Sequence, residues 1–373
     1  MKIGVLKDLK QGEERVGMTP ENVKILTGSG HEVLVEKGAG IGAGFAEEDY
    51  ITAGAQIVTV EEAWDAELIV RVKEPIESEF KHMKPGQIIW GFLHLATNKA
   101  TVEKMMELGI TSFSAENIRK NGAFPLLKPL SAIAGRRAVN MGQYYLEKQH
   151  GGSGILLPGI PEAEISAGQV VIFGGGTAAE NAADIAVSMG CPVTILELND
   201  KRSEQLQKLY AGKNVTILKS TTEALAENIR KADLFISTIL IPGAKPPKLV
   251  KEYMVKSMKK GSVIVDIAID QGGTVETIDR VTTHESPVFL KHDVVHYAVP
   301  NMPGAVPQTA TLAMSKGNIE YLKQIADKGL DEALRSSGTL VSGMSIYKGK
   351  IVSQPLADSI DLPYIIVEAE DFK

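Results

Sequence analysis

Cysteine is almost absent from this sequence. The single cysteine, Cys191, excludes an internal disulfide, and no neighbouring residue is of a kind that would activate a thiolate. No apolar run reaches membrane-spanning length, and the N-terminus leads straight into a predicted strand without the features of a secretory signal. These absences predict a cytoplasmic protein with no role inside a membrane.

Positive charge is also scarce. The formal net charge is −6 and no basic tract occurs, which argues against a nucleic-acid partner. What the sequence does have is the composition of an ordinary globular protein, with 44% hydrophobic and 23% charged residues. Its 373 residues exceed one typical core and therefore predict two domains.

One stretch, residues 170–197, has the order strand, glycine turn, helix, strand. A short apolar run at 170–173 leads directly into three glycines, and alanine-rich helical spacing follows. The pattern matches the dinucleotide-binding fingerprint Gly-x-Gly-x-x-Ala. In this fingerprint Gly174 makes the turn, Gly176 lets the backbone approach a pyrophosphate, and the small Ala179 permits close packing of the helix. The stretch therefore predicts a dinucleotide site.

The residues around this turn also predict which dinucleotide binds. The helix begins at Thr177 and Ala178, where free N–H groups and the helix dipole favour phosphate. Glu197 ends the next strand at the spacing of the acid that binds the adenosine ribose; its charge would repel a 2′-phosphate, so we expect NAD rather than NADP. A second glycine-rich run, at 38–44, precedes neither a long helix nor an acid-ended strand, and we interpret it as a structural loop.

Strand and helix patterns alternate along the whole chain. In the first part, helices are predicted to begin at Thr19-Pro20 and at residue 99, and strands are predicted at 2–6, 32–36, 68–72, 88–92 and 111–114. In the second part, a helix is predicted at 131–148 and strands at 170–173, 193–197, 215–218, 234–238, 262–267 and 294–297. A helix at 308–326 would return the chain to the first part. The predicted fold class is α/β, with two Rossmann-like doubly wound domains and a cleft between them. The first, discontinuous domain would hold the substrate and the second NAD, with boundaries at 1–128 plus 304–373 and at 129–303.

Four polar residues lie at or just after the carboxyl ends of predicted strands. Arg15, Lys73 and His94 do so in the first domain and Asp270 in the second. Because ligands of such sheets bind outside these ends, we expect all four to converge on the cleft. Each residue also has a plainer alternative. Arg15 would form an ion pair in solvent with Glu13 or Glu14, and Lys73 would be an ordinary cation at a strand end. His94 would be a histidine of the core, and Asp270 would cap a glycine turn.

A metal site is not predicted. His292 and His296 have the spacing of two ligands on one helix face, but the residues between them are typical of a strand. On a strand this spacing does not correspond to a helical ligand pair.

Six segments together are far more specific than the glycine fingerprint. They are Glu14-Arg15-Val16 with Thr19-Pro20, Val72-Lys73-Glu74-Pro75, Leu93-His94-Leu95-Ala96, Pro242-Gly243-Ala244-Lys245, Asp266 to Gly273, and Asn301-Met302-Pro303. In these segments the sequence resembles the bacterial alanine dehydrogenases, and the resemblance runs over nearly the whole chain, weakening after about residue 350.

The resemblance implies a reaction and a set of residues. The family reversibly converts L-alanine, NAD and water to pyruvate, ammonium and NADH, and it usually forms homohexamers. By position, Arg15 and Lys73 match its substrate-binding residues, and His94 and Asp270 match its catalytic pair. The predicted cofactor contacts are Gly174, Gly176, Thr177, Ala178, Ser131, Glu197, Arg202, Ser220, Ile239, Leu240, Ile267, Asp270 and Met302.

These residue types suit the implied chemistry. Arginine offers a planar fork to a carboxylate, and lysine can bind a carboxylate or a developing carbonyl oxygen. Water addition and ammonia loss need one group that takes and gives a proton near neutral pH, which histidine does. Asp270 could hold the amine or the attacking water.

The sequence departs from the family pattern at Ala132, Ala179 and Pro300, which affects the expected cofactor affinity more than the reaction type. Two other functions remain open. A transhydrogenase subunit would carry an Arg-x4-Gln-x2-Asp set, which residues 114–130 lack, and a non-catalytic sensor would have lost one of the four site residues. Another small 2-oxo acid also remains open as the substrate.

Overall fold

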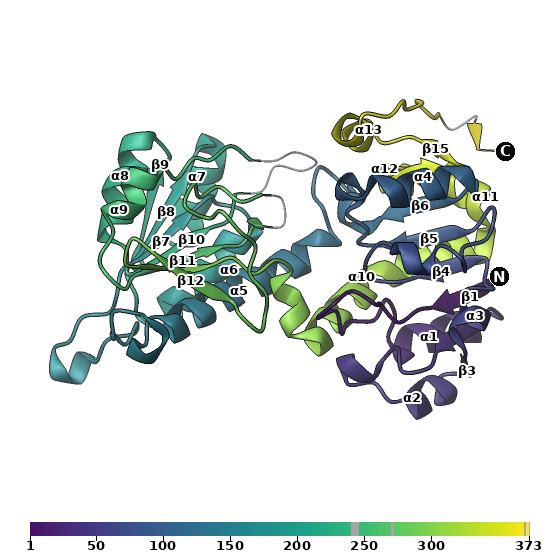
Figure 1. The fold of residues 1–373 in the computed structure, drawn as a ribbon, viewed down its shortest axis with the longest axis horizontal. Coiled ribbons are helices and arrows are strands. Elements are labelled where there is room, and N and C mark those ends of the chain that lie inside the picture. Colours follow the sequence, from purple (N-terminus) through teal and green to yellow (C-terminus); the bar gives the residue numbers. More distant parts are fainter. Residues whose placement is uncertain (240–245, 270–271, 369–370, 373) are drawn as a thin grey trace. The chain divides into compact units, whose positions relative to one another are not determined.

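The computed structural model describes residues 1–239, 246–269, 272–368 and 371–372. The chain divides into two compact units, Met1–Leu130 with Val306–Lys373 and Ser131–Ala305. Each unit is an α/β assembly around a mainly parallel sheet (Figure 1), which confirms the predicted fold class. The divisions lie two residues beyond the expected boundaries, at 130 against 128 and at 305 against 303.

The first unit contains a sheet in the order β15-β14-β6-β5-β4-β1-β2-β3. Its strands are β1 (Lys2–Val5), β2 (Glu32–Glu36), β3 (Gln56–Val58), β4 (Leu68–Val70), β5 (Ile88–Gly91), β6 (Thr111–Ser114), β14 (Met344–Tyr347) and β15 (Lys350–Ile351). Its helices are α1 (Pro20–Gly28), α2 (Glu47–Thr52), α3 (Val60–Ala63), α4 (Lys99–Glu107), α10 (Pro307–Lys328), α11 (Leu330–Arg335), α12 (Gly338–Ser342) and α13 (Gln354–Ile360). Side chains of α3, α4 and α13 pack with β4, β5 and β14 in one buried cluster.

The side on which successive strands are added reverses inside this sheet. From β1 the chain adds β2 and β3 on one side, and then β4, β5 and β6 on the other, all parallel. The switch point therefore lies between β1 and β4, where α/β sheets bind their ligands. On the far edge β14 pairs antiparallel with β6, and β15 with β14.

The second unit contains a sheet in the order β12-β13-β11-β10-β7-β8-β9. Its strands are β7 (Val170–Phe173), β8 (Val193–Glu197), β9 (Val215–Lys219), β10 (Leu234–Ser237), β11 (Val263–Asp266), β12 (Val288–Lys291) and β13 (Val294–Tyr297). Its helices are α6 (Thr177–Ser188), α7 (Asp200–Leu209), α8 (Thr222–Lys231) and α9 (Glu252–Lys256), preceded by α5 (Leu127–Tyr145), which begins in the first unit.

Strand β7 shows why this sheet is so apolar. Val170 and Ile172 belong to one buried cluster, and Val171 and Phe173 to another on the opposite face. Because successive side chains alternate between faces, a strand covered on both sides must be apolar throughout. The switch point here lies between β7 and β10, so the glycine turn stands at it.

The predicted elements agree closely with the structure, with one shifted helix. The helix expected at 131–148 is α5, Leu127–Tyr145, which begins and ends earlier. It ends because Glu147 is extended, and a separate short turn, Lys148–His150, ends at Gly151 with φ 87°. The predicted start of the first helix is confirmed in detail, since the side chain of Thr19 accepts the N–H of Asn22 as the N-cap of α1.

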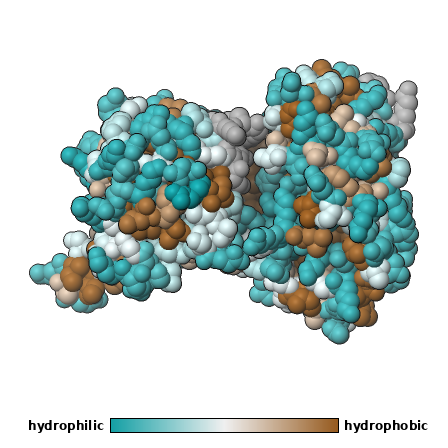
Figure 2. Space-filling view, viewed as in Figure 1, coloured by the Kyte–Doolittle hydropathy of each residue, from teal (hydrophilic) through white to brown (hydrophobic). Residues whose placement is uncertain are grey.

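Exposed apolar side chains gather on segment 155–168 of the second unit. Leu156, Ile160 and Ile165 are each 41% to 55% exposed, and a β-bridge joins Ile160 to Ile165. Figure 2 shows apolar surface of this kind on a projecting part of that unit. Among the residues that the structure describes, no helix is long and apolar enough to cross a membrane.

Candidate active site

The candidate site of the first unit lies at four neighbouring strand ends. Glu116 follows β6, His94 follows β5, Lys73 follows β4, and the segment to Arg15 follows β1. Because these strands are parallel neighbours beside the switch point, their carboxyl ends bring the side chains to one edge of the sheet. Arg15, Lys73 and His94 were predicted from the sequence, whereas Glu116 was not.

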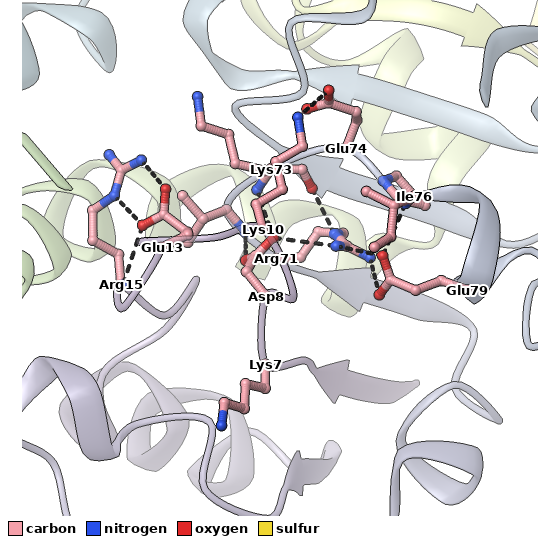
Figure 3. Close-up of polar contacts among 12 residues, drawn as sticks. Lys7, Asp8, Lys10, Glu13, Arg15, Arg71, Lys73, Glu74, Ile76 and Glu79 are labelled. Atoms are coloured by element: carbon pink, nitrogen blue, oxygen red, sulfur yellow. Dashed lines mark hydrogen bonds and ion pairs between the residues drawn. The ribbon is translucent and has the colours of Figure 1, made fainter. Parts of the chain in front are cut away.

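Arg15 forms a buried ion pair rather than the solvent pair considered as its plainer alternative (Figure 3). Its Nε donates to Glu13 Oε1 at 2.6 Å and its Nη2 to Glu13 Oε2 at 2.5 Å, with both side chains 2% exposed. Burial alone would raise the pKa of Glu13, but Arg15, together with the charge of Lys73, holds it below its ordinary value. The planar fork of Arg15 is thereby fixed in orientation.

Lys73 is positioned by a buried charge network beneath it. The fully buried Arg71 donates to Glu79 at 2.9 and 3.0 Å, to Asp8 at 3.1 Å, and through Nε to the carbonyl of Lys73 at 2.5 Å. Asp8 in turn accepts the N–H groups of Val72 and Lys73 at 2.9 and 3.1 Å. Burial raises the pKa of Asp8 despite the charge of Arg71. The network anchors the backbone from which the Lys73 side chain extends.

His94 has an unusual backbone and a suppressed positive charge. Its φ of 44° and ψ of 43° are left-handed, a conformation that non-glycine residues adopt mainly where the surroundings enforce it. Burial and the charges of Lys73, Arg15 and Lys10 lower its pKa well below the ordinary value. About a third of the side chain stays exposed, at 34%. The imidazole is thus neutral near pH 7 and able to accept a proton.

Two further carboxylates complete the cluster. Glu74 pairs with Lys10, and Glu116 Oε1 accepts the N–H of His94 at 2.8 Å. The signal for Glu116 was present in the sequence, because it follows a strand end as His94 does. Asp8 follows the end of β1 and gave the same signal, whereas Arg71 lay inside the predicted strand 68–72 and gave none.

The glycine turn of the second unit has an open space at its tip. Gly174 has φ 101°, and a Cβ there would lie 2.7 Å from Thr238 Oγ1. A Cβ on Gly175 would lie 2.5 Å from Glu197 Oε2, so this position also requires glycine, which the fingerprint did not predict. At Gly176 a Cβ would meet nothing within 4 Å. Since neither φ nor packing requires glycine at 176, the open space fits a ligand that approaches the backbone.

The end of α6 suits an anion. Gly176 is its N-cap and offers no side-chain oxygen to the first-turn N–H groups, which begin at Thr177 and Ala178. Arg202 Nε donates to the carbonyl of Gly175 at 2.6 Å and pairs with Glu180, so it braces the turn. Glu197 ends β8 as predicted.

The other predicted cofactor residues follow the strand ends of the same unit or lie in helices. Ser220 follows β9 and donates its N–H to the carbonyl of Glu197 at 3.0 Å, while Ile267 follows β11 and donates to Ser237 at 3.0 Å. Ile239 follows β10, Ser131 lies in α5, and the buried Met302 accepts Arg137 Nη1 at 2.6 Å. Leu240 and Asp270 lie outside the described residues.

Asp266 is the last residue of β11 and binds backbone N–H groups of the residues that follow. Its carboxylate accepts the N–H of Ala268 at 3.1 Å and of Thr274 at 2.9 Å. Burial raises the pKa of Asp266 to about 6, although these N–H groups oppose the shift. The two hydrogen bonds fix the backbone at Ala268 and at Thr274 relative to β11.

The two histidines considered as a metal pair have separate partners. His296 lies in β13 and contacts Thr277 and the carbonyl of Val294, at 2.8 and 2.9 Å. His292 pairs with Glu252 at 2.7 Å. The strand assignment of the intervening residues is confirmed.

Comparisons with known proteins agree along the chain. Family models described as alanine dehydrogenase/PNT match residues 4–134 with the N-terminal domain and 138–354 with the C-terminal domain. Alanine dehydrogenase 1 of Staphylococcus aureus (strain MSSA476) is 58% identical over 365 residues, 98% of each chain. A solved structure described as L-alanine dehydrogenase has a TM-score of 0.92 at 41% identity, covering 97% of this chain and 99% of that one. The transhydrogenase from Sinorhizobium meliloti has a TM-score of 0.83 at 26% identity, covering 94% and 100%.

Proposed function

The chain belongs to the alanine dehydrogenase/PNT family, and we propose that it interconverts L-alanine and pyruvate with His94 as general acid and base. The observation that carries this proposal is the position of His94, Lys73 and Arg15 after neighbouring parallel strand ends, where burial, with the charges of these cations, lowers the pKa of the imidazole. A carboxylate substrate needs the cations, and a proton transfer needs the neutral imidazole.

The family is NAD-dependent, and the glycine turn fits this cofactor by its open space at Gly176 and its uncapped helix end. When bound there, NAD would accept two electrons and the hydrogen that the substrate Cα gives up. Glu197 would bind the adenosine ribose and disfavour a 2′-phosphate.

The remaining steps use the chain's own residues. Arg15, whose Nε and Nη2 are bound by Glu13, would offer Nη1 to the substrate carboxylate, and Lys73 would bind the developing carbonyl oxygen. Water would add to the oxidised Cα while His94 takes one of its protons, and His94 would return that proton to the nitrogen. The C–N bond would then break as the new hydroxyl becomes the carbonyl and its proton leaves with the ammonia as ammonium. Asp270, outside the described residues, would hold the amine or the water.

Purified protein tests the reaction directly. With NAD and L-alanine, the absorbance of NADH should rise rapidly. Replacing L-alanine by D-alanine, L-serine or glycine, or NAD by NADP, should give little rise. Absence of reduction with every amino acid, while NADH still binds, would contradict the proposal and favour a sensor. Activity with another amino acid would retain the reaction and change its substrate.

Substitution of Gly176 separates cofactor binding from folding. Because its Cβ would meet no protein atom, Gly176→Ala should unfold at the wild-type temperature yet bind NADH about tenfold or more weakly. Gly174→Ala is the contrasting variant, since its positive φ and contact with Thr238 should destabilise the unit itself. Fluorescence titration of NADH and thermal melting measure both. Unchanged NADH affinity in Gly176→Ala would show that the open space does not hold the cofactor.

We also propose a homo-oligomer, as is usual in the family. The exposed apolar side chains of Leu156, Ile160 and Ile165 support it, since such patches mark contact surfaces. Mass photometry of the purified protein would give the number of subunits, and a monomer would contradict the proposal.

A further inference from the structure

Glu116 contacts His94 at two points. Its Oε1 accepts the backbone N–H of His94 at 2.8 Å and lies 3.8 Å from the imidazole Nδ1. The backbone hydrogen bond supports the left-handed conformation of His94, and the second distance places a carboxylate beside the ring. One acidic side chain therefore lies beside both the backbone N–H and the ring of the histidine.

The second oxygen of Glu116 is buried and has no hydrogen-bond partner among the described residues. An unsatisfied buried carboxylate is costly, so such groups are retained mainly where they take up a proton or face a changing charge. Burial raises the pKa of Glu116 to about 7, and the charge of Glu74 adds to this. The N–H groups of Glu116 and His94 and the charge of Lys73 oppose it.

The positive charges of Lys73, Arg15 and Lys10 would repel a protonated His94. Within the described part of the chain, the carboxylate oxygen that lies within 4 Å of a ring nitrogen of His94 belongs to Glu116. We propose that Glu116 is a positioning residue for His94, which holds its backbone and balances its positive charge when the imidazole accepts a proton. This inference rests on the acid–base role of His94 in the proposed function.

The role has a consequence for pH dependence. During deamination the proton leaves the attacking water as the C–O bond forms, and the imidazolium then stands beside Glu116. An ionised Glu116 stabilises that state, whereas a protonated Glu116 does not. The kcat for L-alanine oxidation should therefore rise with pH through about 7, where Glu116 loses its proton.

Glu116→Gln tests this, because the amide oxygen can still accept the His94 N–H but carries no charge. We expect the variant to fold and bind NADH, with KM for L-alanine little changed and kcat about ten- to a hundredfold lower. The rise in kcat near pH 7 should be absent. Glu116→Asp should lower kcat less and keep the rise. Glu74→Gln, which removes the same charge from the same cluster, should move the rise toward lower pH.

Wild-type kcat and pH profile in Glu116→Gln would overturn the inference. If His94→Asn is then inactive, the proposed function still stands; an active His94→Asn would remove that function instead. Should Glu116→Gln fail to fold, Glu116→Asp decides, because unchanged kcat in that variant would also overturn the role.

Discussion

His94→Ala should abolish turnover of L-alanine with NAD while leaving NADH binding largely intact. The imidazole beside Lys73 and Arg15 is the proposed general acid and base, and loss of such a group lowers rates by about a hundred- to ten-thousandfold. NADH should still bind, because the glycine turn belongs to the second unit. Stopped-flow reduction of NAD and fluorescence titration of NADH measure the two effects.

Two variants make this result interpretable. His94→Asn keeps a side chain that tolerates the left-handed backbone, so its inactivity could not be assigned to strain. His292→Ala removes a histidine of similar exposure, 27%, that pairs with Glu252 in the second unit, and it should remain active. Near-normal activity of His94→Ala would remove the histidine from the mechanism.

Arg71→Met should be among the most destabilising single substitutions in the first unit. Asp8 and Glu79 would remain buried without their cation, and breaking such a network by removing one partner costs about 3–5 kcal/mol. The carbonyl of Lys73 would also lose its donor, so residual folded protein should bind substrate poorly. Urea denaturation followed by tryptophan fluorescence measures the loss, since Trp64 and Trp90 are buried in this unit.

The stability of Arg71→Met should depend on pH, and Asp8 determines the sign of this dependence. Burial already raises the pKa of Asp8, and removal of Arg71 would raise it further, so the folded variant would bind a proton that the unfolded chain releases. Its stability should therefore be greater near pH 5 than near pH 8, falling as pH rises through the folded pKa. Lys231→Met, which loses the exposed pair with Glu227, should change stability little. Equal stability of Arg71→Met and wild type would contradict a structural role for the network.

The strands and the site edge were predictable because both are local signals. Strands such as 68–70 and 170–173 are short apolar runs bounded by polar residues or glycine, and a parallel sheet buried on both faces requires such runs. Arg15, Lys73 and His94 were found by their position after strands, a rule that also covers Glu116.

What the sequence did not predict depends on distant partners. Arg71 sits in an apolar run, and its pairing with Asp8 joins residues that are 63 positions apart. Strands β14 and β15 have four and two residues, and their pairing is set by the exposed edge of β6 rather than by their own pattern. The left-handed His94 was also missed, because its conformation comes from tertiary contacts rather than residue type.

The pairing of β6 with β14 has a consequence for synthesis on the ribosome. Between Ser114, the last residue of β6, and Met344, the first of β14, the ribosome must add 230 residues (344 − 114). At usual elongation rates the edge of β6 is left without its neighbour for on the order of ten to fifty seconds, while the entire second unit emerges. Such an uncovered edge can pair with other chains. We therefore expect the nascent first unit to be open to wrong pairing at β6 until its last strands are made.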